Sequence, residues 1–282
     1  MRIKSKHIKL VACDLDGTLL HHNKPVSAST PAQLRALGRK GVVRVIATGR
    51  SHFSAKKALH KDFPIDYLAL SGGAALMDWR TGKILYAHEL DTAFLHKALY
   101  LLKKYDMDFM LHEPLPENHR FFYHHNGHKN DDFDRRLEMY SDFAGTLAEK
   151  GNAIERASRF VVVLRKGQKF PEALYRKLGQ LNIIRSTSPL DHESEWIEIY
   201  PGQASKASAI QFICDKLGVG RDEVLTIGND YNDLDMLQMT PHSFVLSSAP
   251  AELREAFTVL RASTENALES VIKEYFEIEG IP

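Results

Sequence analysis

The chain has 282 residues, of which 44% are hydrophobic and 26% charged, and its formal net charge is +1. This composition is typical of a globular protein, and the length suits one large domain or two of ordinary size. A nearly neutral chain gives no electrostatic reason to expect nucleic acid or an anionic membrane as a partner. No apolar run reaches the roughly 18 residues that a membrane-spanning helix needs.

The cysteines and the N-terminal segment bear on the cellular compartment. Cys13 and Cys214 are the two cysteines of the chain, and so few fit a reducing environment. The basic start is followed by a short apolar segment that Asp14 interrupts, so a signal peptide is not expected. We therefore expect a cytoplasmic protein.

The first part of the chain alternates strands and helices. The apolar run Lys9–Cys13 predicts a buried strand that leads directly into Asp14 and Asp16. Pro31 suits the first turn of a helix, and Gly41 suits the position just past its end. The predicted elements are strands 9–13, 42–47 and 67–70 and helices 30–39 and 54–59. This alternation favours a parallel sheet covered by helices on both faces.

The middle of the chain, from about residue 76 to residue 189, is more polar. The predicted elements are helices 92–105, 134–147 and 171–181 and strands 84–87, 108–111, 160–164 and 182–186. The histidines at His119, His124, His125 and His128 lack a convincing zinc-ligand spacing and predict a polar loop. This mixture predicts a separate α+β domain.

The strand–helix alternation returns at Trp196–Tyr200, which predicts a further core strand. The later predicted elements are helix 206–217, strand 224–227, a helix containing Leu234 and Leu237, strand 243–246 and helix 251–257. The expected fold class is α/β, with a Rossmann-like parallel sheet core and an inserted α+β cap domain. The core is expected at residues 1–80 and 190–282 and the cap at residues 81–189.

Three predicted core strands end in polar, small or acidic residues. They lead into Asp14, Thr48 and Gly228. Ligands of open parallel sheets bind beyond the carboxyl ends of the strands. We therefore expect these three strand ends to form one functional edge.

These segments resemble the four motifs of the haloacid dehalogenase superfamily of phosphohydrolases. Residues 14–18, Asp-Leu-Asp-Gly-Thr, match the first motif, and Thr48 in Ile-Ala-Thr-Gly-Arg matches the second. Lys206 corresponds to the basic third motif, and residues 228–233, Gly-Asn-Asp-Tyr-Asn-Asp, to the acidic fourth. The Thr-Gly-Arg form, Ser-Gly-Gly-Ala at residues 71–74 and the long insertion resemble the Cof-type branch. The resemblance covers essentially the whole chain.

The residue types at these motifs suit phosphoryl transfer, which needs an in-line nucleophile, charge neutralisation and positioning. Asp14 is the candidate nucleophile, because a carboxylate can form an aspartyl phosphate and so divide one difficult step into two. Asp16 is the candidate general acid and base, which would protonate the leaving alkoxide and later deprotonate the attacking water.

Other residues of the motifs are candidates for binding the phosphate. Thr48 offers a hydroxyl donor, and Lys206 offers a compact cation to the phosphate and to the nucleophile. Backbone amides near Leu15 and Gly49 would add an anion-binding nest. Arg50 is expected to be a structural ion-pair partner.

A phosphate dianion facing Asp14 would be repelled unless a cation intervened, and Mg²⁺ suits an all-oxygen site. The resemblance implies Mg²⁺ ligands from Asp14, from the Asp16 backbone carbonyl and from the first acid of the fourth motif. In this chain that position is Asn229, whose amide oxygen can bind Mg²⁺ with less charge. Asp230 is the alternative ligand if the loop shifts by one residue.

The fourth motif also contains Asp233 and Asn232, which the resemblance implies to be supporting residues around Lys206 or a metal-bound water. The expected function is Mg²⁺-dependent hydrolysis of a small phosphorylated metabolite, a sugar phosphate in the first place. A phosphotransferase or mutase using the same site and a non-catalytic sensor of phosphorylated metabolites are the alternatives. The expected partner is a small phosphorylated molecule, the substrate.

Overall fold

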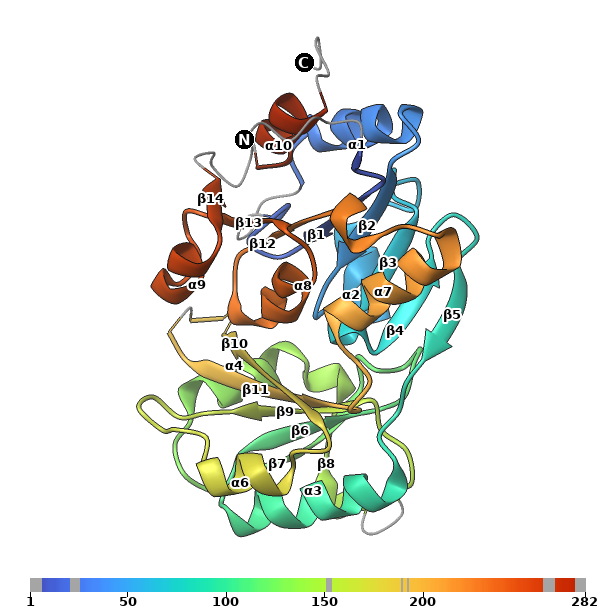
Figure 1. The fold of residues 1–282 in the computed structure, drawn as a ribbon. Coiled ribbons are helices and arrows are strands. Elements are labelled where there is room, and N and C mark those ends of the chain that lie inside the picture. The colour runs from blue at the N-terminus through green and yellow to red at the C-terminus, as the bar shows by residue number, and fades with distance from the viewer. Residues whose placement is uncertain are drawn as a thin grey trace. The chain divides into compact units, whose positions relative to one another are not determined.

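The computed structural model describes residues 7–20, 26–150, 154–188, 190–191, 193–260 and 267–276. The chain divides into two compact units (Figure 1). Unit 1 consists of residues 1–50, 55–86 and 205–282, and unit 2 of residues 51–54 and 87–204. Unit 1 is therefore built from both ends of the chain. None of the described helices has the length and apolar character needed to cross a membrane.

An eight-stranded sheet forms the centre of unit 1, with the order β14-β13-β12-β1-β2-β3-β4-β5. Neighbours from β14 to β3 pair in parallel, whereas β4 runs antiparallel to β3. The strands are β1 (Leu10–Asp14), β2 (Val43–Ala47), β3 (Tyr67–Leu70), β4 (Ala75–Asp78), β5 (Lys83–Ala87), β12 (Val224–Gly228), β13 (His242–Leu246) and β14 (Thr258–Leu260). The predicted α/β fold class is confirmed, and the sheet is mixed with a parallel centre.

Helices cover both faces of this sheet. The α-helices are α1 (Thr30–Arg39), α7 (Lys206–Leu217), α8 (Leu234–Gln238), α9 (Ala251–Ala256), α10 (Ala267–Tyr275) and α2 (His52–Ala58), which spans the division between the units. The short 3-10 helices are η2 (Ser71–Gly73), η4 (Arg221–Glu223) and η5 (Tyr231–Asp233).

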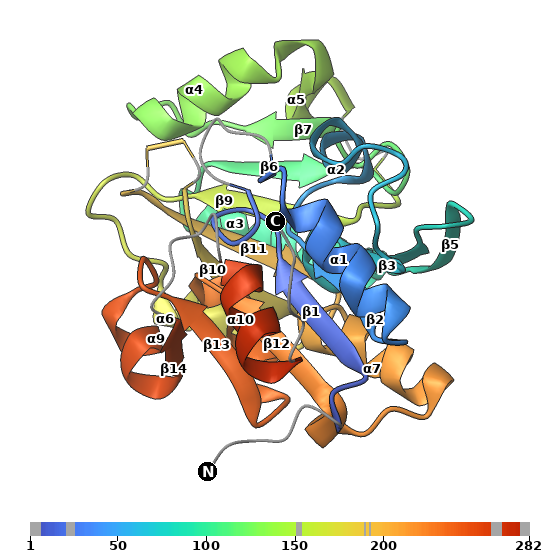
Figure 2. The ribbon, with the colours of Figure 1, turned by 90° about the horizontal axis from the view of Figure 1, so that it is seen from above.

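Two neighbouring residues of β2 show which helices cover which face. Val45 packs in one cluster with Ile210 and Ile213 of α7. Side chains alternate along a strand, and Arg44 accordingly donates from Nη1 to the carbonyl oxygen of Leu34 in α1, at 3.2 Å. α10 packs beside α1, as Figure 2 shows. The sheet is therefore buried between α7 on one face and α1 on the other.

Unit 2 contains a six-stranded sheet with the order β10-β11-β9-β6-β7-β8. Neighbouring strands pair antiparallel except β7 and β8, which are parallel. The strands are β6 (Phe109–His112), β7 (Phe121–His124), β8 (Ala144–Thr146), β9 (Arg159–Val163), β10 (Asn182–Thr187) and β11 (Glu195–Tyr200). The helices are α3 (Thr92–Lys104), α4 (Asp131–Met139), η3 (Ser141–Phe143), α5 (Leu147–Lys150) and α6 (Glu172–Lys177).

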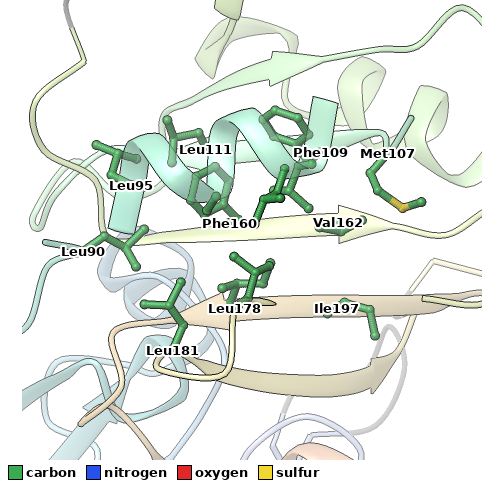
Figure 3. Close-up of a cluster of buried hydrophobic side chains, with 14 of the residues drawn as sticks. Leu90, Leu95, Met107, Phe109, Leu111, Phe160, Val162, Leu178, Leu181 and Ile197 are labelled. Carbon is green, nitrogen blue, oxygen red and sulfur yellow. The ribbon is translucent and has the colours of Figure 1, made fainter. Parts of the chain in front are cut away.

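Unit 2 has a hydrophobic core of its own (Figure 3). Phe109 of β6 and Phe160 of β9 lie in one buried cluster with Leu95 of α3 and with Leu178, which follows α6. Burying one such side chain contributes about 1.5–3 kcal/mol. The middle of the chain is thus an α+β unit, as its composition predicted.

Strand β11 corrects the predicted division of the chain. Trp196–Tyr200 was expected to be a core strand, but β11 pairs with β10 and β9 in the sheet of unit 2. Unit 2 therefore extends to Ala204, beyond residue 189, where the cap was expected to end. Residue 189 itself lies outside the described residues. At the other boundary, the strand predicted at residues 84–87 is β5 of the core sheet, not a cap strand.

The histidine-rich segment and the helix that follows it also differ from the prediction. His124 is the last residue of β7, so the expected polar loop contains a strand with the aromatic residues Phe121 and Phe122. The helix predicted at residues 134–147 is α4, which begins at Asp131 and ends at Met139. Strands β4, β8 and β14 and helix α10 were not predicted.

Candidate active site

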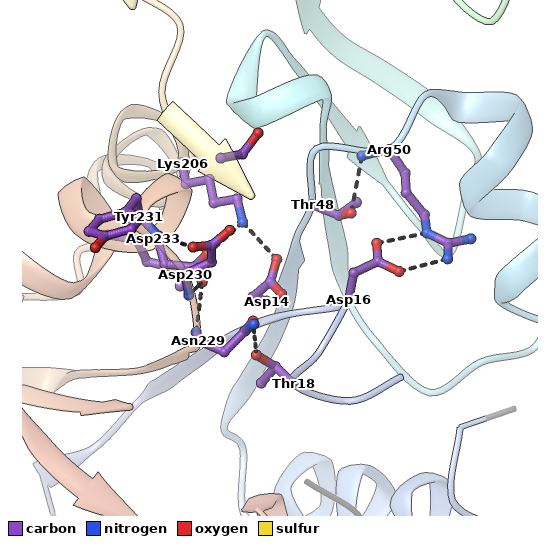
Figure 4. Close-up of polar contacts among 12 residues, drawn as sticks. Asp14, Asp16, Thr18, Thr48, Arg50, Lys206, Asn229, Asp230, Tyr231 and Asp233 are labelled. Carbon is purple, nitrogen blue, oxygen red and sulfur yellow. Dashed lines mark hydrogen bonds and ion pairs between the residues drawn. The ribbon is translucent and has the colours of Figure 1, made fainter. Parts of the chain in front are cut away.

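The carboxyl ends of β12, β1 and β2 lie next to one another, because these three strands are parallel neighbours in the sheet. β1 ends in Asp14, β2 leads into Thr48, and β12 leads into Asn229. The three strand ends therefore share one edge, as expected from the sequence. Figure 4 shows their polar side chains together with Lys206, which is the first residue of α7.

Lys206 joins two acids that come from distant parts of the chain. Its Nζ lies 2.6 Å from Asp14 Oδ1 and 2.6 Å from Asp233 Oδ1. The lysine and Asp233 are completely buried, and Asp14 is 3% exposed. This arrangement places two buried carboxyl groups against one buried ammonium group.

Burial and the unequal number of acids and bases shift the pKa values in this cluster. Burial, and then the neighbouring Asp233, raise the pKa of Asp14 to about 8, although Lys206 opposes them. Burial alone would lower the pKa of Lys206, but its ion pairs outweigh burial and raise that pKa above the usual value. Burial and the adjacent Asp14 also raise the pKa of Cys13, so this thiol is an inert packing group.

Three local features hold Lys206 at the start of α7. The Ser205 hydroxyl accepts from the backbone N–H of Ser208, and the Ser208 hydroxyl accepts in return from the N–H of Ser205. Such a reciprocal cap satisfies amides that a helix start leaves free. Asp235 Oδ2 accepts from the backbone N–H of Ala207 at 2.9 Å. A Cβ atom on Gly73, whose φ is +89°, would clash with the carbonyl oxygen of Ser205.

The loop after β12 is organised around Asp233. Its Oδ2 accepts from the backbone N–H groups of Asn229, at 2.8 Å, and Asp230, at 3.2 Å, while its Oδ1 contacts Lys206. Asp230 Oδ1 accepts from the N–H of Tyr231 at 2.8 Å. Asp233 thus shapes the loop and pairs with the lysine, which is the contact expected of a supporting acid.

Asp16 is oriented by an arginine from the neighbouring strand end. Arg50 Nε and Nη2 donate to the two carboxylate oxygens of Asp16 at 2.8 and 2.6 Å. The Thr48 hydroxyl accepts from the backbone N–H of Arg50 at 3.1 Å and is buried. The Asp16 side chain is 47% exposed, so the two motif acids differ sharply: Asp14 is enclosed and Asp16 faces solvent.

The Asn229 side-chain amide reaches across to the first motif. One of its two terminal atoms lies 2.9 Å from the Asp16 carbonyl oxygen, 2.9 Å from Thr18 Oγ1 and 3.2 Å from Asp14 Oδ2. These groups are oxygen donors of the type that Mg²⁺ prefers, and the fit to Mg²⁺ is good when the amide presents its oxygen. Among the described residues, no group of three or more His, Cys, Asp or Glu side chains is arranged to hold a metal.

The remaining predicted site residues lie at the same edge of unit 1. Leu15 follows β1 and is buried, and its carbonyl accepts from the backbone N–H groups of Leu19 and Leu20. Gly49 follows Thr48 after β2, and Asn232 lies half-buried in η5. Their phosphate-binding and supporting roles stay predictions.

Two contacts of the site were not foreseen in the sequence. Thr18 was quoted as part of the first motif without a role, yet its hydroxyl meets the Asn229 amide. Arg50 was expected to form a structural ion pair, and its partner is Asp16, the candidate acid and base. The motif positions signalled both residues, but a spacing pattern does not say which side chains meet.

Known proteins match this chain over most of its length. The model of the haloacid dehalogenase-like hydrolase family matches residues 11–274. A 5-amino-6-(5-phospho-D-ribitylamino)uracil phosphatase of Bacillus subtilis is 26% identical over 285 residues, with 93% of this chain and 96% of the relative covered. A putative phosphatase of Haemophilus influenzae is 25% identical over 275 residues, with 94% of each chain covered.

Solved structures share the fold over nearly the full length. A phosphatase of the haloalkanoate enzyme superfamily from Bacteroides thetaiotaomicron has a TM-score of 0.75 at 20% identity, with 96% of each chain covered. A sugar phosphatase of subclass IIB of the same superfamily has a TM-score of 0.74 at 18% identity, and 96% of this chain and 100% of that chain are covered.

Proposed function

This chain belongs to the haloacid dehalogenase-like hydrolase family and is a phosphatase, and we propose that it hydrolyses phosphate monoesters of small metabolites through an aspartyl phosphate on Asp14. One observation carries this proposal: the buried cluster in which Lys206 joins Asp14 to Asp233. A carboxyl group is costly to bury unless charged partners are provided. Lys206 supplies such a partner to Asp14, and its positive charge also favours the approach of the phosphate that Asp14 would attack.

In the first half of the reaction, an Asp14 carboxylate oxygen attacks the phosphorus and the ester bond to the leaving group breaks. Asp16 gives a proton to the departing alkoxide. Lys206 neutralises charge beside the nucleophile, and the Thr48 hydroxyl donates to a phosphoryl oxygen. In the second half, Asp16 takes a proton from water, the water oxygen attacks phosphorus, and the Asp14–phosphorus bond breaks to release inorganic phosphate.

The proposed cofactor is Mg²⁺, held by Asp14, by the Asp16 carbonyl and by the Asn229 side-chain oxygen. When bound, Mg²⁺ neutralises the phosphoryl oxygens and screens them from the nucleophile. The buried cluster supports a cation, because its two acids and one lysine leave one negative charge uncompensated when both acids are ionised.

The proposed substrate is a small phosphate ester of a sugar-like, hydroxylated metabolite. The Bacillus subtilis relative is named for a phosphoribityl compound, and one structural neighbour is a sugar phosphatase. We also propose a cytoplasmic location, which two free and buried cysteines support.

The test is phosphate release by the full chain with Mg²⁺ from a panel of hexose, pentose, ribityl and nucleotide phosphates. We expect time-dependent release without any sugar acceptor, which separates hydrolysis from transfer to a second sugar. The Asp14→Asn variant is expected to lose about a thousandfold or more of this activity, because the nucleophile is removed.

Asp62→Asn is the matched control, because it makes the same chemical change at an exposed carboxylate. We expect it to retain wild-type activity, and both variants are expected to retain the far-ultraviolet circular dichroism of the wild type. Substantial residual turnover in Asp14→Asn would refute the nucleophile assignment. A wild-type protein that releases no phosphate from any member of the panel would refute the enzymatic function.

A further inference from the structure

The Asn229 amide occupies a place between the groups that the proposed Mg²⁺ site requires. The terminal atom nearest to them lies 2.9 Å from the Asp16 carbonyl oxygen and 3.2 Å from Asp14 Oδ2. A backbone carbonyl can only accept hydrogen bonds, whatever the protonation of the neighbouring acid. Hydrogen bonding therefore assigns the amide nitrogen to this position, where its two protons face three acceptors: the Asp16 carbonyl oxygen, Thr18 Oγ1 and Asp14 Oδ2.

The same positions fit a metal when the amide is turned over. With the amide oxygen in place of the nitrogen, three oxygens gather, and Asn229 Oδ1 lies 2.9 and 3.2 Å from the other two. Adjacent ligands of an octahedral Mg²⁺ are about 3 Å apart, given metal–oxygen distances of about 2.1 Å. One amide orientation therefore closes the site by hydrogen bonds, and the other places the amide oxygen at about the ligand spacing from the Asp16 carbonyl oxygen and from Asp14 Oδ2.

Thr18 can partner the amide in either orientation, and Gly17 leaves space for it. The Thr18 hydroxyl can accept from the amide nitrogen or donate to the amide oxygen across the same 2.9 Å. A Cβ atom on Gly17, whose φ is +80°, would clash with the Asn229 amide. The absence of a side chain at Gly17 therefore leaves the space that the Asn229 amide occupies. The amide nitrogen and oxygen are nearly equal in size, so the amide can turn over within this space.

We propose that Asn229 is an amide switch of the metal site: its nitrogen closes the metal-free site, and its oxygen binds Mg²⁺ after the amide turns over. This inference rests on the Mg²⁺ site of the proposed function. The switch predicts weak Mg²⁺ binding for two reasons. The amide contributes no negative charge, and Mg²⁺ must displace hydrogen bonds that a carboxylate at this position would not make.

The decisive variant is Asn229→Asp, measured by calorimetric Mg²⁺ titration and by thermal unfolding of the metal-free full chain. We expect Mg²⁺ to bind roughly tenfold or more tightly, because a carboxylate adds charge and needs no rearrangement. We expect the metal-free unfolding midpoint to fall by about 3 °C or more, because a carboxylate cannot donate to the Asp16 carbonyl oxygen as the amide nitrogen does. Mg²⁺ affinity within twofold of wild type, or an unchanged metal-free midpoint, would overturn the switch.

Asp62→Asn is the matched control, because it removes one carboxylate charge at an exposed side chain, and we expect it to keep the wild-type Mg²⁺ affinity. Asp230→Asn is the discriminating variant, because Asp230 is the neighbouring candidate ligand and its carboxylate accepts from the Tyr231 N–H. A large loss of affinity in Asp230→Asn, with no gain in Asn229→Asp, would assign the ligand to Asp230 and end the proposal.

The wild-type chain offers a measurement that needs no variant to fold. Without metal, the Asn229 side-chain NH₂ protons are expected to be protected from solvent exchange, and Mg²⁺ is expected to remove this protection. Protons whose exchange is unaffected by saturating Mg²⁺ would contradict the switch.

The failure of this inference can be told apart from failure of the proposed function. If the wild type releases phosphate but Asn229→Asp gains no Mg²⁺ affinity, the amide switch is refuted and the phosphatase function stands. If Asn229→Asp gains Mg²⁺ affinity but the wild type releases no phosphate, the amide switch stands and the phosphatase function is refuted.

Discussion

Single residues set the charge of the candidate active site. Lys206 is the one cation in the buried cluster with Asp14 and Asp233, and a buried pair that loses one partner typically costs about 3–5 kcal/mol. The residue types of this cluster could be predicted, because each stands at a motif position. The pairing of Arg50 with Asp16 could not, because a motif gives the order of residues and not the direction of their side chains.

A second buried residue, His112 of β6, makes stability depend on pH. It is 2% exposed, and its Nδ1 lies 2.9 Å from the backbone carbonyl oxygen of Asn118. Burial, together with the charges of Arg159 and Arg136, lowers the pKa of His112 well below its usual value. In the unfolded chain a histidine titrates near pH ~6.5. Below that pH His112 is therefore protonated in the unfolded state but still neutral in the folded state.

His112 therefore costs no free energy of unfolding above pH ~6.5. Below that pH the free energy of unfolding falls by about 1.4 kcal/mol per pH unit. His112→Asn keeps a hydrogen-bond donor near the position of Nδ1 but cannot be protonated. We expect this variant to show a shallower pH slope of the free energy of unfolding between about pH 6.5 and 5, measured by urea denaturation. His60→Asn, at an exposed side chain, is expected to keep the wild-type slope. Equal slopes in wild type and His112→Asn would contradict this account.

At the scale of elements, the position of α7 decides where Lys206 points. The helix starts at the Ser205 cap, whose carbonyl oxygen passes close to the backbone of Gly73. Side chains cannot fit between them, so η2 and the start of α7 are in direct backbone contact. The bounds of α7 agree with those predicted, because a local apolar periodicity and Gly218 at the end were sufficient signals.

Gly73→Ala is expected to destabilise the protein by about 2–4 kcal/mol and to lower phosphatase activity, because the new methyl group displaces Ser205 and with it Lys206. Gly82→Ala is the control, since Gly82 also has a positive φ, +71°, but no atom lies within 4 Å of its Cβ position. The control is expected to lose only about 1 kcal/mol. Chemical denaturation of both variants measures the difference, and equal losses would show that the contact with Ser205 does not matter.

Features that depend on contacts between distant parts of the chain were harder to predict than features set by the local sequence. Strand β11 has a clear strand pattern, but its hydrogen-bonding partners, β9 and β10, are chosen by the packing of unit 2. A single-sequence pattern identifies a strand and not its sheet. β7 was missed because histidines follow and precede its aromatic residues, and such a stretch has no apolar alternation to detect.

At the scale of the whole molecule, residues 192 positions apart in the chain, Asp14 and Lys206, meet in unit 1. Unit 1 therefore brings together candidate catalytic groups from both chain ends, and unit 2 is a separate α+β body with its own core. The division into a core and an insertion could be predicted from the sequence. The boundary at Ala204 could not, because it depends on the pairing of β11 with β9 and β10, which only the structure shows.

The central claim is that Asp14 carries the phosphoryl group during turnover. The most direct measurement is a rapid acid quench of the full chain during hydrolysis of a substrate found in the panel, followed by peptide mass spectrometry. The account predicts a phosphoryl group on the peptide that contains Asp14, removable by hydroxylamine and absent from Asp14→Asn. Steady phosphate release with no phosphoryl group on the protein, or with one on another residue, would contradict it.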